Sequence, residues 1–330
     1  YAPFHAIWKH IMNVSLKDLK KNYGNLNVSF DLWKGESDAQ PYIPGLIEDL
    51  QKKGLAYESD GALVVDIAQE GDAKEYPPCI VRKSDGAALY ATSDLATIIE
   101  REQDFHPDRY IYVVDKRQEL HFIQVFRVAK KAGIVKEDTP MIFLGFGTMN
   151  GKDGGPFKTR EGGVMRLEHL IKNIDEKVYE KIQEKQKVPA DEMTRTAEIV
   201  GLAALKYADL SNQATKDYIF DVDRFISFEG NTGPHIQYMI VRIKSILEKY
   251  KELRGADAKV VPIRPAESET EKALQMALCR FGEVTESAFY ETAPHKLCQY
   301  MAAVADACNA FYLGNKILSE EDAVKQAAFI

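Results

Sequence analysis

The strongest constraint on the fold is a strand, helix and strand pattern in the middle of the chain. The run RYIYVVD at residues 109–115 is short, β-branched and aromatic, which is typical of a buried strand. It leads into a helical pattern, ELHFIQVFRVAKKAGI, which closes at Gly133, and then into a second apolar run, MIFLGFG at 141–147. A strand, a helix and a strand within about 40 residues form a parallel crossover unit. This part of the chain is therefore predicted to be α/β, with a parallel sheet of the kind that binds nucleotides.

The flanking segments extend this prediction. Helices are expected over residues 4–23 and within PYIPGLIEDLQKKGL, and strands at NVSFDLW and at ALVVDI, residues 62–67. The segment CIVRKSDGAALYATSD is expected to form a hairpin with its turn at residues 84–86, followed by a helix from about Ser93. After Glu168 the pattern becomes almost entirely helical. An α/β half is thus followed by an all-α helical bundle.

Composition limits the class of protein. A chain of 330 residues with 45% hydrophobic and 28% charged residues is in the globular range and long enough for roughly two domains. It contains no apolar run long enough to span a membrane and no signal-peptide pattern, so we expect a soluble, cytoplasmic protein. The net charge of -7 argues against a protein that coats polyanions unselectively, yet a local basic surface could still bind RNA.

A glycine-rich stretch, FGTMNGKDGGPFKTREGG at residues 146–163, follows the second strand of the crossover unit. Open α/β sheets bind their ligands at the carboxyl ends of their strands. Glycines let backbone N–H groups approach a ligand closely, and Lys158 and Arg160 supply positive charge two residues apart. This combination suits a polyphosphate, whose charge shifts in a transition state. The alternative is a mobile basic hairpin tip without a ligand.

Two pairs of polar residues flank the first strand of the crossover unit, one pair before the strand and one after it. In LYATSDLA, Tyr90 and Asp94 are expected near the start of a helix, where a phenol and a carboxylate could receive a guanidinium or ammonium group. Alternatively, Asp94 or Ser93 caps the helix. In VVDKRQELHFIQ, Gln118 and His121 are three residues apart at a helix start and can point to one side. An ordinary surface-facing helix start would explain them equally well.

The helical half carries one mixed polar and aromatic segment, NTGPHIQYMIVRIK. Asn231 or Thr232 is expected to cap a helix, along which amide, aromatic and basic side chains such as Gln237 and Arg242 follow. Such a face can stack on unpaired bases and hold phosphates. The alternative is that Tyr238 and its apolar neighbours form a buried stripe with a solvated basic back. The sequence indicates neither a hydrolytic triad nor a dedicated metal site.

Five segments, in this order and spacing, resemble arginyl-tRNA synthetase. They are DGAALYATSDLATI, YIYVVDKRQELHFIQVF, FGTMNGKDGGPFKTREGG, LAALKYADLSNQATKDYIFDVDRFISFEGNTGPHIQY and APHKLCQYMAAVADACNAFY. The resemblance covers nearly the whole chain from Val28 onward. It implies a Rossmann-like class I nucleotide-binding sheet, followed by a helical anticodon-binding bundle. Its substrates would be L-arginine, ATP with Mg²⁺, and tRNA(Arg), and the protein would be a monomer that does not bind membranes.

The resemblance also implies roles for individual residues. Tyr90 and Asp94 match the positions that hold the substrate guanidinium, and Gln118 matches a polar contact to arginine. The ATP site would comprise four positions, His121 at its edge, Gly147, Met149 and Lys158. The mobile catalytic loop of class I synthetases commonly carries two lysines. In this sequence Lys158 alone matches the second of these lysines, and Arg160 lies nearby. The tRNA-binding positions would be Asn231, Gln237 and Arg242.

The expected division is a partial catalytic domain at residues 1–222 and an anticodon-binding domain at 223–330. The HIGH-type signature that the family places at the start of its nucleotide fold is missing, since His5 and His10 lie on an amphipathic helix with no glycine between them. We therefore expect the carboxyl-terminal part of a synthetase, lacking the first half of its nucleotide fold and its last helices, which folds but does not catalyse alone. The alternative function is a non-catalytic tRNA-binding module.

Overall fold

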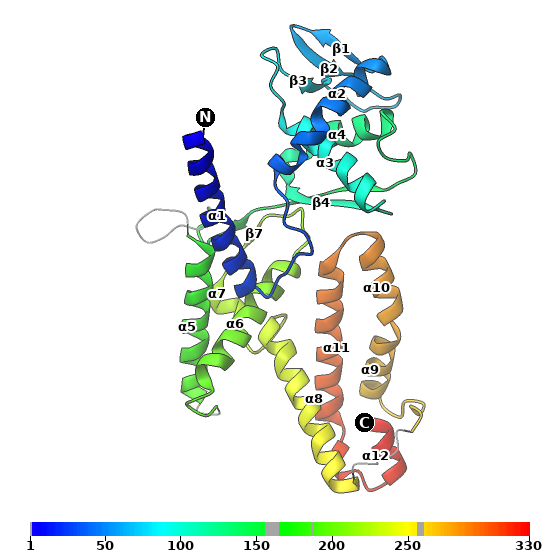
Figure 1. Cartoon of the computed structure of the whole chain (residues 1–330). Coiled ribbons are helices and arrows are strands. Elements are labelled where there is room, and N and C mark those ends of the chain that lie inside the picture. The colour runs from blue at the N-terminus through cyan, green and yellow to red at the C-terminus, as the bar shows by residue number, and fades with distance from the viewer. Residues whose placement is uncertain (1, 156–164, 186–187, 256–260) are drawn as a thin grey trace. The chain divides into compact units, whose positions relative to one another are not determined.

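The chain forms two compact units (Figure 1), one made of residues 30–147 and the other of residues 1–29 together with 148–330. The computed structural model describes residues 2–155, 165–185, 188–255 and 261–330. The mixed α/β start and the helical end agree with the predicted fold class.

The unit of residues 30–147 contains the predicted crossover. Its elements, in chain order, are η1 (Glu36–Tyr42), α2 (Ile43–Lys52), β1 (Ala56–Ser59), β2 (Ala62–Val65), β3 (Cys79–Arg82), α3 (Tyr90–Asp104), β4 (Tyr110–Asp115), η2 (Lys116–Gln118), α4 (Glu119–Lys131) and β5 (Met141–Phe146). Strands β1, β2 and β3 form an antiparallel sheet in that order. Strands β4 and β5 pair in parallel over six residues, from Tyr110 opposite Met141 to Asp115 opposite Phe146.

One hydrophobic core holds this unit together. Leu95 and Ile98 of α3 and Val125 and Val128 of α4 are completely buried in it, together with apolar side chains of α2, β2 and β3. The other side of β4 is exposed at Ile111 and Val113, so the predicted strand is confirmed but is covered on one face only among the described residues. Because both α3 and α4 are anchored in the core, the backbone at their starts has a fixed position.

Two local predictions were wrong in this unit. NVSFDLW is not a strand, because its residues form a turn and an irregular connection with a bend at Asp31, which leads into η1. The expected hairpin at residues 84–86 is only a turn, closed by a hydrogen bond of 2.9 Å from Lys83 N to Ala87 O. Strand β3 pairs with β2 instead, and Gly86 adopts a positive φ of 83° that favours glycine. As a result α3 begins directly after the turn, at Tyr90 rather than near Ser93.

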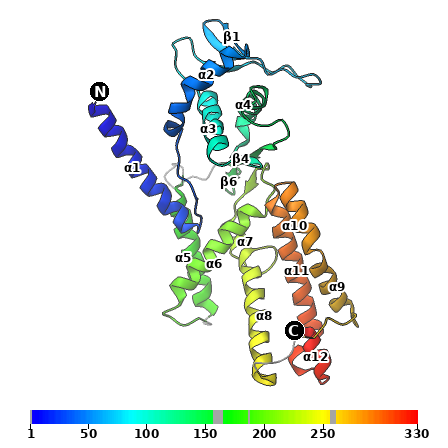
Figure 2. The same cartoon turned by 45° about the vertical axis from the view of Figure 1, so that its right-hand side comes forward.

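The other unit is mostly helical (Figures 1 and 2). Its elements are α1 (Ala2–Asn25), β6 (Met149–Asn150), α5 (Leu167–Lys185), α6 (Met193–Leu210), β7 (Tyr218–Ile219), α7 (Val222–Phe225), α8 (Gly233–Arg254), α9 (Glu269–Cys279), α10 (Phe281–Tyr290), α11 (Pro294–Gly314), η3 (Ile317–Ser319) and α12 (Ala323–Phe329). Its core is formed mainly by α5 and α6, with Ile174 and Val178 almost fully buried, and includes Phe220 and Ile226. No helix in the described ranges is long and apolar enough to cross a membrane.

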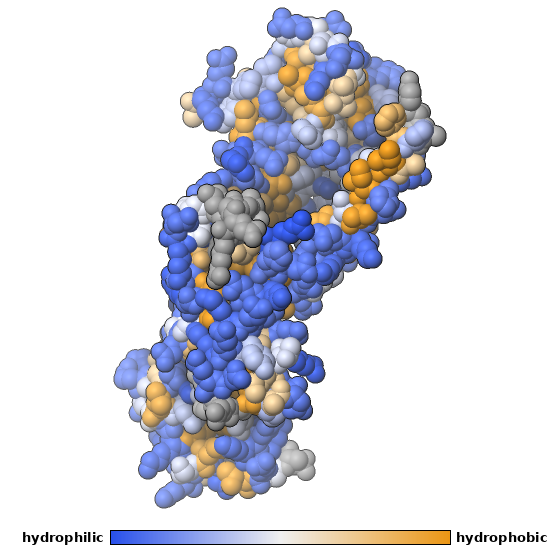
Figure 3. All heavy atoms as spheres, turned by 90° about the vertical axis from the view of Figure 1, so that its left-hand side faces the viewer, coloured by the Kyte–Doolittle hydropathy of each residue, from blue (hydrophilic) through white to orange (hydrophobic). Residues whose placement is uncertain are grey.

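Helix α1 carries an apolar stripe that stays exposed. Phe4, Ile7, Trp8 and Ile11 recur at helical spacing, as the sequence predicts, and their exposed fractions lie between 44% and 70%. Figure 3 looks onto the face on which α1 lies and shows apolar side chains in contact with solvent there. Lys21 near the end of the helix pairs with Glu168 at the start of α5 at 2.5 Å.

Candidate active site

The first site element is the start of α3, which a threonine ties to the neighbouring strand. Thr92 Oγ1 accepts a hydrogen bond of 3.1 Å from Leu89 N and donates one of 2.7 Å to the carbonyl of Val81 in β3. The bond from Leu89 N satisfies one of the free N–H groups at the helix start. Since Thr92 fills this role, the alternative that Asp94 serves only as a cap is wrong, and its carboxylate is available for another partner.

That partner is His121 in the first turn of α4. His121 Nε2 lies 2.6 Å from Asp94 Oδ2, and the two residues are 27 positions apart in the sequence. The side chains are 24% and 32% exposed, so the pair is accessible to a ligand but partly withdrawn from water. The structure therefore joins two of the residues that the sequence singles out, from two separate motifs.

The other two predicted arginine contacts lie at the ends of the same helices. Tyr90 is the first residue of α3, one turn before Asp94, and is 72% exposed. Gln118 is exposed directly before α4, three residues ahead of His121. Helical spacing places Tyr90 on the face of Asp94 and Gln118 on the face of His121.

Tyr112 and Arg101 adjoin this pair and were missed by the sequence analysis. Arg101 Nη1 donates a hydrogen bond of 3.0 Å to the Tyr112 hydroxyl. Burial raises the pKa of Tyr112 to about 12, with Arg101 opposing and the charge of Asp94 adding to the shift, so this phenol stays neutral. The alternation in YIYVVD, which puts Tyr110 and Tyr112 on the same side of the strand, was the signal that could have revealed it.

The carboxyl end of β4 is shaped by an acid and a glycine. Asp115 caps η2 and binds the Arg117 guanidinium through both carboxylate oxygens, at 2.9 and 2.7 Å. Hydrogen bonds from Arg117 lower the pKa of Asp115 to about 2. In β5, a Cβ atom on Gly145 would lie 2.9 Å from the Lys116 Cα, so only glycine lets η2 approach the strand this closely. This approach fixes where α4 and His121 begin.

The predicted phosphate-binding residues are described only in part. Lys158 and Arg160 lie outside the described residues. Gly147 is half-buried at the end of its unit, and Met149 lies in β6, opposite Tyr218 of β7, with its side chain against the core of the helical unit. In the same stretch, Lys152 lies 3.0 Å from Asp221 and 3.3 Å from Asp223, whose hydrogen bonds raise the pKa of Lys152. This lysine holds the glycine-rich segment to α7.

The predicted tRNA contacts cluster around α8, whose start is capped by Thr232. Its hydroxyl accepts a hydrogen bond of 3.2 Å from His235 N. Asn231 Oδ1 accepts a bond of 2.5 Å from the hydroxyl of buried Tyr207, which also lies 2.8 Å from the carbonyl of Cys298. Gln237 donates to the carbonyl of Ile199 at 3.4 Å. Asn231 and Gln237 thus connect α8 to α6.

Arg242 connects α8 to α11. Its guanidinium lies 4.8 Å from the ring centres of both Tyr238 and Tyr312 and bonds Asn309 Oδ1 at 2.5 Å. A cation between two aromatic rings is a favourable packing arrangement. The alternative of a buried stripe along α8 is wrong, since Tyr238 and Ile240 are both 47% exposed.

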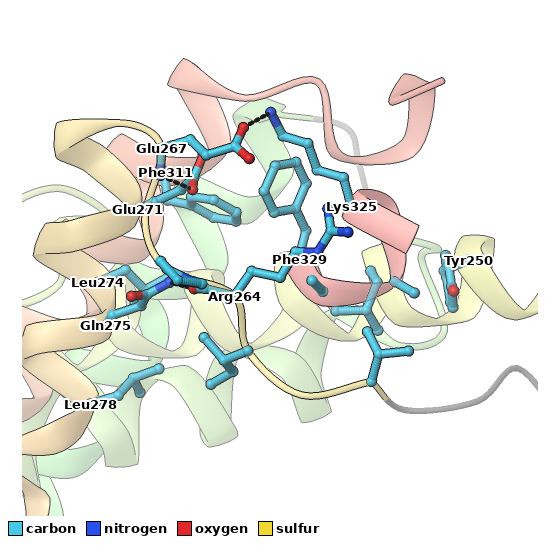
Figure 4. A pocket seen from close by; sticks show the side chains of 16 residues that line it. Tyr250, Arg264, Glu267, Glu271, Leu274, Gln275, Leu278, Phe311, Lys325 and Phe329 are labelled. Carbon is cyan, nitrogen blue, oxygen red and sulfur yellow. Dashed lines mark hydrogen bonds and ion pairs between the residues drawn. The ribbon is translucent and has the colours of Figure 1, made fainter. Parts of the chain in front are cut away.

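A separate cavity of about 330 Å³ lies between the helices at the end of the chain (Figure 4). Lys325 forms an ion pair with Glu267 at 2.7 Å, and the Glu271 carboxylate accepts a hydrogen bond of 2.8 Å from the backbone N–H of Glu267. None of the predicted site residues that the structure describes lines it. We interpret both interactions as structural, holding α12 to the segment before α9.

Family models match both parts of the chain. The model described as "tRNA synthetases class I (R), catalytic domain" matches residues 2–222, and the "DALR anticodon binding domain" matches residues 236–328. An arginine–tRNA ligase of Agathobacter rectalis is 56% identical over 99% of this chain and 56% of its own length. One of Alkaliphilus oremlandii is 55% identical over 99% of this chain and 55% of its own length. The chain thus spans about half the length of the curated relatives it matches.

Solved structures share the fold at lower identity. An arginyl-tRNA synthetase from Plasmodium falciparum matches with a TM-score of 0.82 and 23% identity, over 98% of this chain and 54% of the solved one. One from Thermus thermophilus matches with a TM-score of 0.77 and 19% identity, over 97% and 60% of the two chains. At these identities the likeness concerns the fold alone.

Proposed function

Because this chain belongs to the family of class I (R) tRNA synthetases, we propose that it serves to ligate L-arginine to tRNA(Arg). In this reaction the arginine carboxylate attacks the α-phosphate of ATP, and arginyl-adenylate forms while pyrophosphate leaves. The terminal ribose hydroxyl of tRNA(Arg) then takes the arginyl group, and AMP is released. The relatives named arginine–tRNA ligase support this reaction for the complete protein.

One observation carries the proposal: the Asp94 carboxylate lies partly buried between the starts of α3 and α4. A guanidinium is planar and presents several donors, and a carboxylate in such a position is its natural acceptor. Tyr90 and Gln118 would complete the arginine site from the ends of the same two helices. Two cations nearby already have other partners, since Arg117 is bound by Asp115 and Arg101 donates to the Tyr112 hydroxyl.

ATP would occupy a site that includes Gly147, Met149 and the glycine-rich segment, with Lys158 and Arg160 neutralising the phosphates during transfer. Mg²⁺ would accompany ATP, since this ion is usually held by substrate phosphates and one or two carboxylates. The described residues form no group of three or more His, Cys, Asp or Glu that could hold a metal by themselves.

The helical part would bind tRNA, with the anticodon-binding domain at residues 223–330 and the catalytic part at 1–222. The match of the anticodon-binding family model to residues 236–328 supports this division. Asn231, Gln237 and Arg242 are proposed to act on tRNA mainly by positioning α8, because each already bonds a neighbouring helix or loop. The complete protein is proposed to be cytoplasmic and monomeric.

The test is arginine-dependent exchange of pyrophosphate into ATP in the presence of tRNA(Arg). It is run on this chain and on a version extended at the amino terminus to the length of the relatives. We expect activity in the extended version, and loss of at least a hundredfold in arginine-dependent exchange on Asp94→Asn. Asp104→Asn, at the exposed end of the same helix, is the matched control and should stay active. Silence in both versions, combined with intact tRNA binding, would favour a non-catalytic tRNA-binding module.

A further inference from the structure

The hydrogen bond between His121 and Asp94 leads beyond the proposed arginine site. His121 is the first-turn residue of α4 that reaches the carboxylate on α3, with 2.6 Å between Nε2 and Oδ2. A bond to a carboxylate at this distance is short and charge-assisted. It therefore limits the rotation of the Asp94 carboxylate about its own axis.

Both ends of this bond are attached to rigid elements. On α3, Asp94 is followed by Leu95, and on α4, His121 is followed by Phe122, and both of these neighbours are buried. The His121 ring also meets the Phe122 ring edge to face, at 4.8 Å between centres. A side chain fixed by packing and by a hydrogen bond can define a binding geometry to a fraction of an ångström.

The charged groups around the Asp94 carboxylate have other partners, so His121 is the residue that orients it. Arg101 of α3 is directed to the Tyr112 hydroxyl, at 3.0 Å, and Arg117 of η2 is bound by Asp115 on both oxygens. Burial raises the pKa of Tyr112, and the negative charge of Asp94 adds to the shift. His121 thus holds Oδ2, and no side chain in the described part of the chain is seen to bond Oδ1.

We propose that His121 is a positioning residue of the amino acid pocket, which fixes the plane of the Asp94 carboxylate so that it accepts a planar guanidinium in preference to an ammonium group. This inference rests on the proposed function and moves His121 from the edge of the ATP site to the arginine site. A guanidinium presents its N–H groups in one plane, whereas an ammonium group is a compact point charge that binds a rotating carboxylate equally well. Fixing the carboxylate therefore favours arginine over lysine.

The experiment compares His121→Ala and His121→Gln in the amino-terminally extended protein. Glutamine can present an amide N–H near the position of Nε2, whereas alanine removes the donor. We expect His121→Ala to raise the KM for arginine about tenfold and to reduce the preference for arginine over lysine. The KM for ATP should stay within about twofold, and His121→Gln should recover most of the lost arginine affinity. His169→Ala, an exposed histidine on α5, is the control and should change neither constant.

Three outcomes would overturn the inference. The first is a raised KM for ATP with an unchanged KM for arginine, which would place His121 in the ATP site. The second is an unchanged preference for arginine over lysine in His121→Ala, and the third is equal loss in His121→Gln and His121→Ala. Failure of the proposed function is distinguishable, since the unsubstituted extended protein would then show no arginine-dependent exchange at all.

Discussion

At the scale of single residues, Gly201 of α6 faces Asp175 of α5. A Cβ atom at position 201 would lie 2.2 Å from Asp175 Oδ1 and 3.3 Å from an Ile174 methyl group. Gly201→Ala should therefore displace the Asp175 carboxylate and crowd the contact between the two helices, lowering the free energy of unfolding by about 1 to 3 kcal/mol. Urea denaturation followed by circular dichroism measures this change.

A second glycine provides the matched control. Gly282 lies in α10, and a Cβ atom there would meet nothing within 4 Å. Gly282→Ala should stabilise the protein by about 0.5 to 1 kcal/mol, because alanine restricts the unfolded chain and favours helix. If both glycine substitutions shift the unfolding midpoint in the same direction, the close approach of α5 and α6 is not as described.

Asp175 also predicts a dependence of stability on pH. Burial, assisted by the charge of Glu198, raises its pKa to about 6 from an ordinary value of 3.8. Between these two values the folded state keeps a proton that the unfolded state has lost, so the contribution of this group to stability falls as pH rises through 4 to 6. Asp175→Asn should remove this dependence and raise stability above pH 6 by on the order of 1 kcal/mol.

Melting temperatures of Asp175→Asn and the unsubstituted chain, taken from pH 4 to pH 8, provide the measurement. The two curves should converge toward pH 4 and separate toward pH 7. Asp108→Asn, on an exposed loop, is the control and should give parallel curves. Curves of Asp175→Asn that separate toward low pH instead would contradict the assigned direction of the pKa shift.

At the scale of elements, Arg242 joins α8 to α11 through two aromatic rings and Asn309. Lysine at this position would keep the charge but lose the planar group that stacks and bonds at once. Arg242→Lys should therefore lower the free energy of unfolding by about 1 to 2 kcal/mol. Lys244→Arg, the reverse exchange at an exposed position on the same helix, should change it by less than about 0.5 kcal/mol. Equal effects in a urea titration would refute the linking role.

The elements that the sequence predicted well are those with a strong local pattern. Strands β4 and β5, helix α4 and the long helices α5, α6 and α8 follow directly from apolar periodicity. The predictions of a strand at NVSFDLW and of a hairpin at residues 84–86 were wrong, because a short apolar run becomes a strand only where another strand is available to pair with it. Strand β3 pairs with β2 instead. Local propensity does not contain that information.

At the scale of the whole molecule, the candidate site depends on contacts between distant segments. The sequence singled out Asp94 and His121 for different ligands, and only the packing of α3 beside α4 brings the two side chains within 2.6 Å. Tyr112 and Arg101 were missed for the same reason, because their roles follow from the neighbours that the fold supplies. Residue types and motifs predicted the candidate site, whereas its internal hydrogen-bond partners required the three-dimensional structure.

The two compact units have separate hydrophobic cores, one around Leu95 in residues 30–147 and one around Ile174 in the helical unit. Both side chains are almost fully buried, so replacing either by alanine should cost about 2 to 5 kcal/mol within its own unit. Since stability is local where cores are separate, each substitution should act on one unit.

Hydrogen exchange followed by mass spectrometry reads out the two units independently. Leu95→Ala should speed exchange in peptides from residues 40–131 and leave those from α5 and α6 unchanged, whereas Ile174→Ala should do the reverse. A variant that speeds exchange equally in both sets would mean that the chain unfolds as one cooperative body. The separate response would instead mean that the proposed arginine site, whose residues lie on α3, η2 and α4, keeps its geometry when the helical unit is weakened.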